Sequence, residues 1–525
     1  MEGTIWAFLP AVIAIVLALL TKQVYISLFL GIFVGALMYA GGDPLKGMFT
    51  LYQVMSGKVG ENTPIIVFLV VLGILVVLMQ KSGGAKAYGD WAGRKISSKS
   101  GALAATAGLG CLIFVDDYFN CLTVGSVMRP VTDKFKVSRS KLSYIIDATA
   151  APICIIAPIS SWAAAVAGEL EGDGLMVFMS TIPFNVYAIL TIVMVFALCY
   201  FKFDFGKMKR NELYTEQTGD VHSGVPEDSG EVEEVKSNPK GKVRDLIIPV
   251  IVLIVCCIGG MLYTGFFYNW DTGTIVKELQ SANVIEAFSN CDAGMSLAIG
   301  STVALIVIAV YYMLAGVLSF KEVTGSFTEG FKAMVPAILI LTFAWSISGI
   351  MGARGGYLNA KGFVQTHLAN SAFPKFLFPA IFFVLAGAIA FATGTSWGTF
   401  GVLVPIAVTI LGGSGTLTIL TVSATLGGAV FGDHISPISD TTILASAGAR
   451  CNHVEHVNTQ LPYAALVAGI AVLAYLVAGA CVGLGSVLSC IIMWVVALGL
   501  FVGAVFLIKY LSKKKEQTAE TPINE

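Results

Sequence analysis

Long apolar segments recur along most of this 525-residue chain, and they restrict what it can fold into. A helix needs about 20 predominantly apolar residues to cross the hydrocarbon core of a membrane, which is about 30 Å thick. The sequence predicts an all-α polytopic membrane protein held in a lipid bilayer. Apolar runs of the required length begin near Ile5, Val24, Pro64, Leu142, Phe178, Asp245, Gly294, Met334, Leu417, Leu461 and Val487.

The composition supports this class and argues against others. Hydrophobic residues make up 56% of the chain and charged residues only 12%, whereas soluble domains carry about 25% charged residues. The net charge of −1 gives no reason to expect a nucleic-acid partner. The ten cysteines form no CxxC pair, so we expect packing residues rather than metal ligands or disulfides. No Walker, haem or nucleophile motif is visible, so we expect neither a cofactor nor an enzyme.

Residues 101–127 are apolar but are flanked by basic residues on both sides. Five Lys and Arg residues lie between Lys81 and Lys99, and five more between Arg129 and Lys141. Basic flanks face the cytoplasm, and one crossing cannot begin and end on the same side. We therefore expect a re-entrant helical hairpin with Asp116 and Asp117 near its tip. Irregular backbone at that depth is tolerated only where protein or water covers it.

The second half of the chain repeats landmarks of the first half in the same order. Thr123-Val124-Gly125 precedes a proline, as does Thr399-Phe400-Gly401, and Pro158-Ile159-Ser160-Ser161 resembles Pro437-Ile438-Ser439-Asp440. The charge distribution gives the two halves opposite orientations, which predicts inverted repeats. The second repeat then contains a matching hairpin at 376–412, with its tip near 393–399, and an interrupted helix at 416–450.

The expected organisation has four parts. Residues 1–202 form the first half, and 203–244, which are polar and acidic in the middle, form a disordered cytoplasmic linker. Residues 245–485 form the second half, and 486–525 add a transmembrane helix and a basic cytoplasmic tail. The N-terminus is expected outside. The stretch from Arg450 to His456 is expected to be a solvated turn.

Polar residues at the hairpin tips and helix breaks are the candidate site. A charge at membrane depth costs roughly 2.5–3.5 kcal/mol on insertion scales and therefore marks function. Sodium favours carboxylate, hydroxyl, amide and carbonyl oxygens, so we expect Na⁺ at Asp117, Asn120, Ser396 and Asp440. The alternative for Asp116 is a helix cap or a charge at a wet tip. The candidate ion- or substrate-binding residues are Asp116, Asp117, Asn120, Thr123, Ser160, Ser161, Thr393, Thr395, Ser396, Thr399, Asp433, Ser436, Ser439 and Asp440.

Proton transfer is assigned to residues of the second helix break. Buried carboxylates titrate closer to neutrality than exposed ones, and imidazole does so unperturbed. Asp433, Asp440 and His434 are therefore the predicted proton relay, although His434 could instead only hydrogen-bond the hairpin. Two interpretations of Asp147 stay open: it is a functional carboxylate, or it is only a charge at the end of a helix.

The segment 431–444, FGDHISPISDTTIL, resembles the signature of the NhaC-type sodium/proton antiporter family. His453-Val454, residues 459–464, and the stretch from Asp116 to Pro130 add to the resemblance. It implies a secondary transporter of the ion transporter superfamily in a prokaryotic plasma (inner) membrane, with an elevator mechanism and a homodimer. The family includes Na⁺/H⁺ antiporters and malate/lactate exchangers, and some relatives carry amino acids. Two interpretations stay open: Na⁺/H⁺ antiport, or Na⁺-coupled transport of a small organic acid or amino acid. Trp162 and Trp397 would suit an organic ligand. A channel is a third possibility, which the paired broken helices disfavour.

Overall fold

A computed structural model describes residues 2–21, 23–170, 174–201, 203–226, 237–269, 274–289, 291–352, 357–363, 366, 374–412 and 415–519. Helices dominate these residues, and the strands assigned among them are one short antiparallel pair, β1 (Tyr268–Asn269) and β2 (Thr274–Ile275). Within the described part of the chain, eight helices are long and apolar enough to cross a membrane. The protein is therefore a helical, multi-pass membrane protein.

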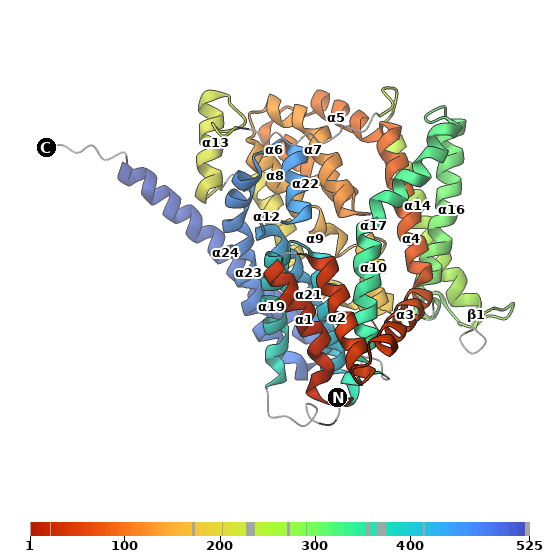
Figure 1. Cartoon of the computed structure of the whole chain (residues 1–525). Helices are drawn as coiled ribbons and strands as arrows, with labels where there is room; N and C mark the ends of the chain where they lie inside the picture. Colours follow the sequence, from red (N-terminus) through yellow and green to blue (C-terminus); the bar gives the residue numbers. More distant parts are fainter. Residues whose placement is uncertain are drawn as a thin grey trace.

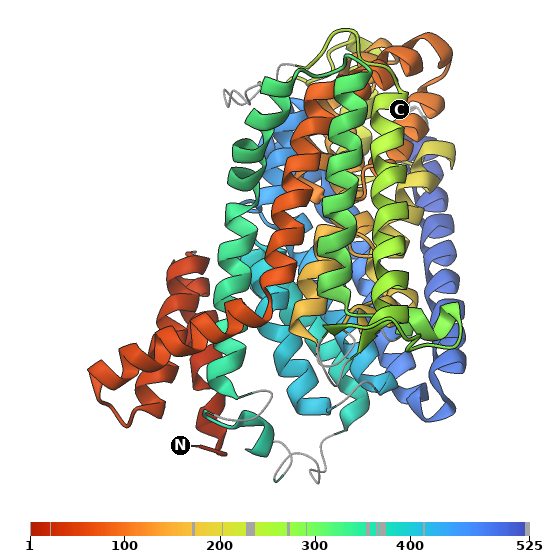
Figure 2. The same cartoon turned by 90° about the vertical axis from the view of Figure 1, so that its right-hand side faces the viewer.

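Four long helices run side by side along one face of the molecule (Figure 2). They are α4 (Thr63–Ser82), α14 (Arg244–Phe267), α16 (Ala293–Leu314) and α17 (Phe320–Met351). Helix α17 bends by 42° at Pro336, because proline removes a backbone hydrogen bond and clashes with the preceding turn.

The N-terminal helices pack against α17 near the lower edge of Figure 1. They are η1 (Ile5–Phe8), α1 (Leu9–Thr21), α2 (Val24–Tyr39) and α3 (Pro44–Glu61). Full spans were expected from Ile5 and Val24, but α1 has 13 residues and α2 has 16. Both are shorter than the roughly 20 residues a span requires.

Residues 101–127 form two helices rather than one straight crossing. After α5 (Gly84–Lys95), the helices α6 (Lys99–Leu112) and α7 (Asp117–Lys134) are separated by four residues, and the two pack together. Asp116 caps α7 by accepting a hydrogen bond from Phe119 N at 3.0 Å. The cap satisfies a backbone N–H that has no partner within the helix.

The apolar run that begins near Leu142 is not one span. It divides into α8 (Arg139–Ala148), α9 (Ala151–Cys154) and α10 (Ser161–Glu169). Pro152 and Pro158 lie in this region, and proline cannot donate the hydrogen bond that continues a helix. The chain continues through α11 (Gly174–Thr181), η2 (Ile182–Phe184) and α12 (Val186–Phe201).

The second half contains the corresponding elements. The predicted hairpin at 376–412 corresponds to α19 (Phe378–Thr393) and α20 (Ser396–Leu411), which separate at Gly394, where φ is +70°. The predicted interrupted helix corresponds to α21 (Thr416–Ile435) and α22 (Asp440–Ala449). The remaining elements are α15 (Val284–Ser289), α18 (Ala360–Phe363), η4 (Lys375–Leu377), α23 (His453–Cys481), η5 (Val482–Leu484) and α24 (Ser486–Ala519).

The prediction of disorder for 203–244 is wrong for Gly206–Thr218, which form helix α13. Its Glu212 is buried, lies 2.7 Å from Lys99 Nζ and 3.7 Å from Lys141 Nζ, and accepts a hydrogen bond from Ser138 N at 2.8 Å. The helix is therefore ordered by charges distant in sequence. Residues 227–236 of the predicted linker lie outside the described residues.

We predict that Glu212→Gln weakens the packing of α13 on α6 and α8, because it leaves the partly buried Lys99 and the buried Lys141 without their shared carboxylate. Breaking a buried ion pair costs about 3–5 kcal/mol. Trypsin should then cleave α13 faster than in the parent protein, as measured by limited proteolysis. Glu216→Gln is the control, because Glu216 also pairs with Lys99, at 2.8 Å, but its side chain is 54% exposed and such pairs contribute about 0–1 kcal/mol. Equal cleavage rates in the two variants would contradict this account.

Candidate functional site

Asp440 connects the two hairpin tips. Its backbone N–H donates to Gly394 O at 3.3 Å, at the tip formed by α19 and α20. Its Oδ2 accepts a hydrogen bond from the Tyr118 hydroxyl at 2.6 Å, in the first turn of α7. Residues 322 positions apart in the sequence therefore meet here. Asp440 and Tyr118 are only partly buried, which leaves this carboxylate accessible.

Asp117 lies against an aromatic cluster that also joins the two halves. Its Oδ2 accepts a hydrogen bond from Trp162 Nε1 at 2.9 Å. The Trp162 ring lies 5.8 Å from the ring of Trp397 and 5.1 Å from that of Phe400, centroid to centroid. All four side chains are buried. The first turns of α7, α10 and α20 are thus held together around one carboxylate.

Two glycines let α7 and α22 touch backbone to backbone. A Cβ at Gly125 would lie 2.4 Å from the carbonyl carbon of Gly448, and a Cβ at Gly448 would lie 2.5 Å from Cys121 O. No larger residue fits at such a crossing. Small residues permit this close approach between membrane helices, and it places the first hairpin directly against the second helix break.

The Asn120 side chain connects backbone segments at the first hairpin tip by hydrogen bonds. Its Nδ2 donates to Gly110 O at 2.7 Å, Ile113 O at 3.0 Å and Thr149 O at 2.9 Å. The Oδ1 atom is buried and makes no hydrogen bond in the described part of the chain. Asn120 thus combines a structural role with a free oxygen acceptor.

We predict that Asn120→Ala lowers the free energy of unfolding by about 2 kcal/mol, because the two amide hydrogens that three carbonyl oxygens share are lost, at about 1 kcal/mol for each hydrogen bond. Thermal unfolding in detergent measures the effect. Asn62→Ala is the control, since Asn62 Nδ2 donates to one carbonyl, Lys58 O, at 3.0 Å. A loss no greater than that of the control would contradict the proposed structural role.

Several other predicted site residues satisfy local backbone groups. Asp116, Ser160, Thr395 and Ser439 cap helices α7, α10, α20 and α22. The hydroxyls of Thr393, Thr399 and Ser436 donate to carbonyl oxygens at 2.7–2.9 Å. Thr123 is buried beside them on α7. Among the described residues, Ser396 Oγ is buried and makes no hydrogen bond, which leaves it able to bind an ion, whereas the buried Ser161 hydroxyl lies beside Asp116.

Asp433 and His434 lie at the C-terminal end of α21, next to the break. Asp433 Oδ2 accepts a hydrogen bond from the Thr441 hydroxyl, and His434 Nδ1 lies 2.9 Å from the Tyr187 hydroxyl. Both residues are buried. The Pro437 break thus turns these side chains toward polar partners on α22 and α12.

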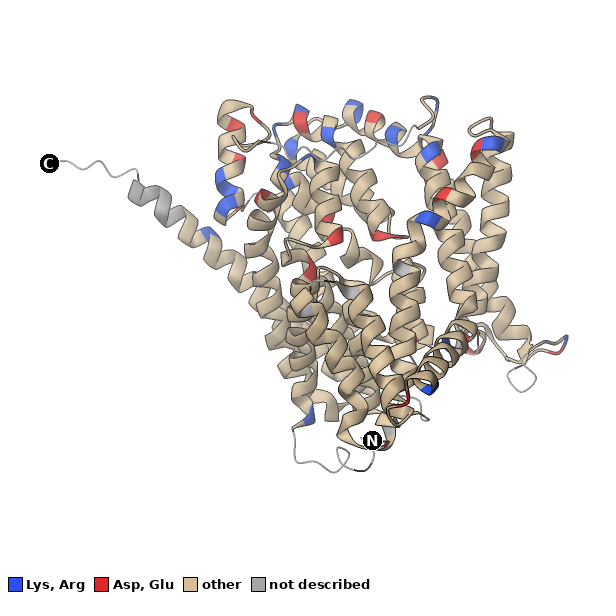
Figure 3. Cartoon of the chain, in the orientation of Figure 1, with Lys and Arg blue, Asp and Glu red and all other residues tan. Residues whose placement is uncertain are grey.

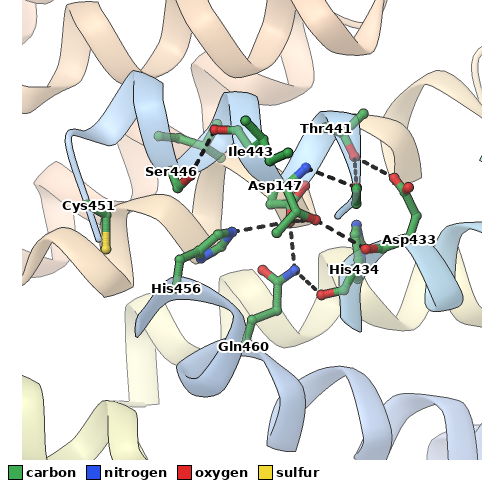
Figure 4. Close-up of polar contacts among 12 residues, drawn as sticks. Asp147, Asp433, His434, Thr441, Ile443, Ser446, Cys451, His456 and Gln460 are labelled. Atoms are coloured by element: carbon green, nitrogen blue, oxygen red, sulfur yellow. Dashed lines mark hydrogen bonds and ion pairs between the residues drawn. The ribbon is translucent and has the colours of Figure 1, made fainter. Parts of the chain in front are cut away.

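Asp147 is the centre of a second buried cluster (Figure 4). Its Oδ2 lies 2.6 Å from Gln460 Nε2, 3.1 Å from the Thr442 hydroxyl and 3.3 Å from His456 Nε2. The expectation of a solvated turn is wrong for His456, which is completely buried on α23. The sequence signal was a His and a Gln four residues apart, which lie on one face of a helix.

The carboxylates between the hairpins have neutral partners. In the described part of the chain, hydrogen bonds to Asp116, Asp117, Asp433 and Asp440 come from hydroxyl, indole and backbone N–H groups. Figure 3 shows acidic residues within the helical body, whereas Lys and Arg gather mainly near its upper edge. A buried carboxylate without a cationic side chain is stabilised by a bound cation, by a proton or by several hydrogen-bond donors.

Buried carboxylates beside broken helices in a multi-pass membrane protein are typical of secondary transporters. A family model described as the Na⁺/H⁺ antiporter family matches residues 172–480. The chain therefore belongs to the Na⁺/H⁺ antiporter family.

Relatives of different degree support this assignment. An uncharacterised protein of Haemophilus influenzae is 39% identical over 501 residues, which cover 91% of each chain. The malate-2H⁺/Na⁺-lactate antiporter of Bacillus subtilis is 33% identical over 156 residues, or 28% of this chain and 31% of that one. The arginine/ornithine antiporter ArcD of Halobacterium salinarum is 39% identical over 109 residues, or 20% of this chain and 22% of that one.

Among solved structures, the YdaH transporter of Alcanivorax borkumensis aligns at 16% identity with a TM-score of 0.42, covering 84% of this chain and 89% of that one.

Proposed function

We propose that this transporter exchanges Na⁺ for H⁺ at a cation site between the two hairpin tips. The observation that carries the proposal is the set of carboxylates there whose hydrogen-bond partners are all neutral. A bound Na⁺ neutralises such a carboxylate, and exchange requires that the transported proton is bound only when Na⁺ is not. Mutually exclusive occupancy is the requirement for exchange.

Four residues are the proposed Na⁺ ligands. Asp440 and Asp117 provide charge, while Asn120 Oδ1 and Ser396 Oγ are buried acceptors without hydrogen bonds in the described residues. The donor set is oxygen throughout, which suits a hard cation. Asp440 is the entry point, because it is only partly buried.

The packing supports an inverted repeat. Helix α7 contacts α22, and its proposed counterpart α20 contacts α10. Likewise α12 contacts α21 and α23 contacts α8. Each pair joins one half to the other, as expected where a site lies at the interface of two repeats. We propose that these helices move as a unit in an elevator cycle, and that the protein is a homodimer.

The basic edge gives the proposed orientation in a prokaryotic plasma membrane. Lys and Arg gather at the edge formed by α5 and α13, while the N-terminus lies at the opposite edge (Figures 1 and 3). Basic loops stay in the cytoplasm. The N-terminus is then outside and the C-terminus, after α24, is cytoplasmic.

Exchange of a small organic acid or amino acid with Na⁺ is the second candidate. The aromatic cluster of Trp162, Trp397 and Phe400 beside Asp117 favours it, since such rings commonly line organic-ligand sites. Two partial relatives carry names of organic-ion antiporters.

Proteoliposomes separate the two candidates. An inward Na⁺ gradient without organic solute should drive H⁺ out through a Na⁺/H⁺ antiporter, and a pH dye in the lumen records it. If protons move only when an organic acid or amino acid is present, the second candidate replaces the first. Ion flux with unitary currents would instead identify a channel.

A further inference from the structure

Asp147, His456 and Gln460 form a buried polar cluster (Figure 4), which the Thr442 hydroxyl joins through Asp147. We propose that the transported proton binds at His456 Nδ1 and that Asp147 is its counter-charge. This inference rests on the proposed Na⁺/H⁺ exchange and assigns the proton to residues that do not hold Na⁺.

The hydrogen bonds at Asp147 define the state of His456. Gln460 Nε2, the Thr442 hydroxyl and His456 Nε2 all point to Asp147 Oδ2. Three such bonds stabilise an ionised carboxylate, which only accepts hydrogen bonds. His456 Nε2 therefore carries the hydrogen, and Nδ1 holds a lone pair.

Three atoms of the cluster are buried without a hydrogen bond in the described residues, namely His456 Nδ1, Asp147 Oδ1 and Gln460 Oε1, and His456 Nδ1 is the nitrogen base among them. A proton from water forms an N–H bond at Nδ1, and the pair of Asp147 and imidazole changes from a net charge of −1 to zero. Release reverses the step, returning the proton to water. Because Nε2–H keeps its bond to Asp147, the imidazolium always lies beside its counter-charge.

Other titratable groups on the surrounding helices have partners of their own. The buried Cys121 thiol of α7 lies near Asp147, and Tyr144 of α8 stacks on Tyr463. The remaining pairs are His434 with Tyr187, Asp433 with Thr441, Asp440 with Tyr118, Asp117 with Trp162, Glu455 with Lys207, Lys141 with Asp204, Glu212 with Lys99, and Tyr463 with Phe205. His456 is thus the imidazole that faces an ionised carboxylate directly.

The cluster is connected to the helix break that positions Asp440. The Thr442 hydroxyl, whose single hydrogen can go to either acceptor, lies 3.2 Å from Asp433 O and 3.1 Å from Asp147 Oδ2. Gln460 Nε2 also donates to His434 O at 2.8 Å. Asp440 and Thr442 share the first turn of α22. A proton at His456 and Na⁺ at Asp440 would therefore both act on the residues of this helix break, so that binding of one can disfavour binding of the other.

Calorimetry of Na⁺ binding to the purified full-length protein tests the proposal. Titrations with NaCl in two buffers of different ionisation enthalpy count the protons released per Na⁺ bound. The parent protein should release protons. His456→Gln keeps an N–H donor for Asp147 but has no titratable nitrogen. This variant should therefore bind Na⁺ without releasing protons. Its Na⁺ affinity should also depend less on pH than that of the parent protein.

His222→Gln is the matched control, since His222 lies after α13 on the cytoplasmic side of the proposed topology, and it should behave as the parent. Proton release by His456→Gln equal to that of the parent would overturn the proton site while Na⁺/H⁺ exchange stands. If the parent itself releases no proton, the exchange proposal and this inference both fail. Should His456→Gln not fold, Asp147→Asn decides by the same readout: retained release overturns the proposal, and lost release supports it.

Discussion

Asp440→Asn should abolish Na⁺-driven proton movement in proteoliposomes. The amide keeps the size of the side chain but removes the charge that offsets Na⁺, and Asp440 is the residue in contact with both hairpin tips. We expect the apparent Na⁺ affinity to fall at least about tenfold, which corresponds to about 1.4 kcal/mol. Dye quenching at several Na⁺ concentrations measures the change.

Asp43→Asn is the control, because it makes the same change at a carboxylate that has a structural role. Asp43 caps α3 by accepting from Leu45 N and Lys46 N at 3.0 and 3.2 Å, and asparagine caps helices equally well. This variant should transport as the parent does. If Asp440→Asn also retains the parent's Na⁺ dependence, Asp440 does not belong to the cation site.

Gly125→Val should destabilise the folded protein by at least about 3 kcal/mol. Overpacking costs about 1–3 kcal/mol even where side chains can yield. Here the added Cβ would meet the backbone of Gly448 at 2.4 Å, and backbone cannot rotate away as a side chain can. The expected result is a lower midpoint of thermal unfolding in detergent and a lower yield of monodisperse protein.

Gly108→Ala is the matched glycine control. A Cβ at Gly108, on the exposed side of α6, would meet nothing within 4 Å. Alanine is favoured over glycine in a helix by about 1 kcal/mol, so stability should stay the same or rise. A similar loss in both variants would show that the α7–α22 crossing is not the cause.

Charge and glycine or proline patterns were sufficient to find the elements that build the site. Basic residues on both sides of 101–127 led to the hairpin, and the structure has a helix end at Leu112 and a new start at Asp117. Gly394 and Pro437 lie where the second-half helices stop. These are local effects, so they are readable from local sequence.

The partners of the site residues were not predictable in the same way. Tyr118 meets Asp440 from 322 positions away, and Gln460 meets Asp147 from 313. Such contacts depend on how helices pack, and helical periodicity does not specify the neighbour. The composition of 203–244 is that of a disordered segment, yet Glu212 is ordered by Lys99 and Lys141 from helices that precede it.

Helix α13 has a consequence for biosynthesis. It leaves the ribosome before the second half exists, and it can dock on α6 and α8 through Glu212 at once. Asn211 and Lys207 are then in place to receive Glu455 of α23, at 2.7 and 2.5 Å, when that helix is made about 240 residues later. The connecting segment is thus positioned before the late helices are made. We expect its contacts with Glu455 to help place α23 against the first half.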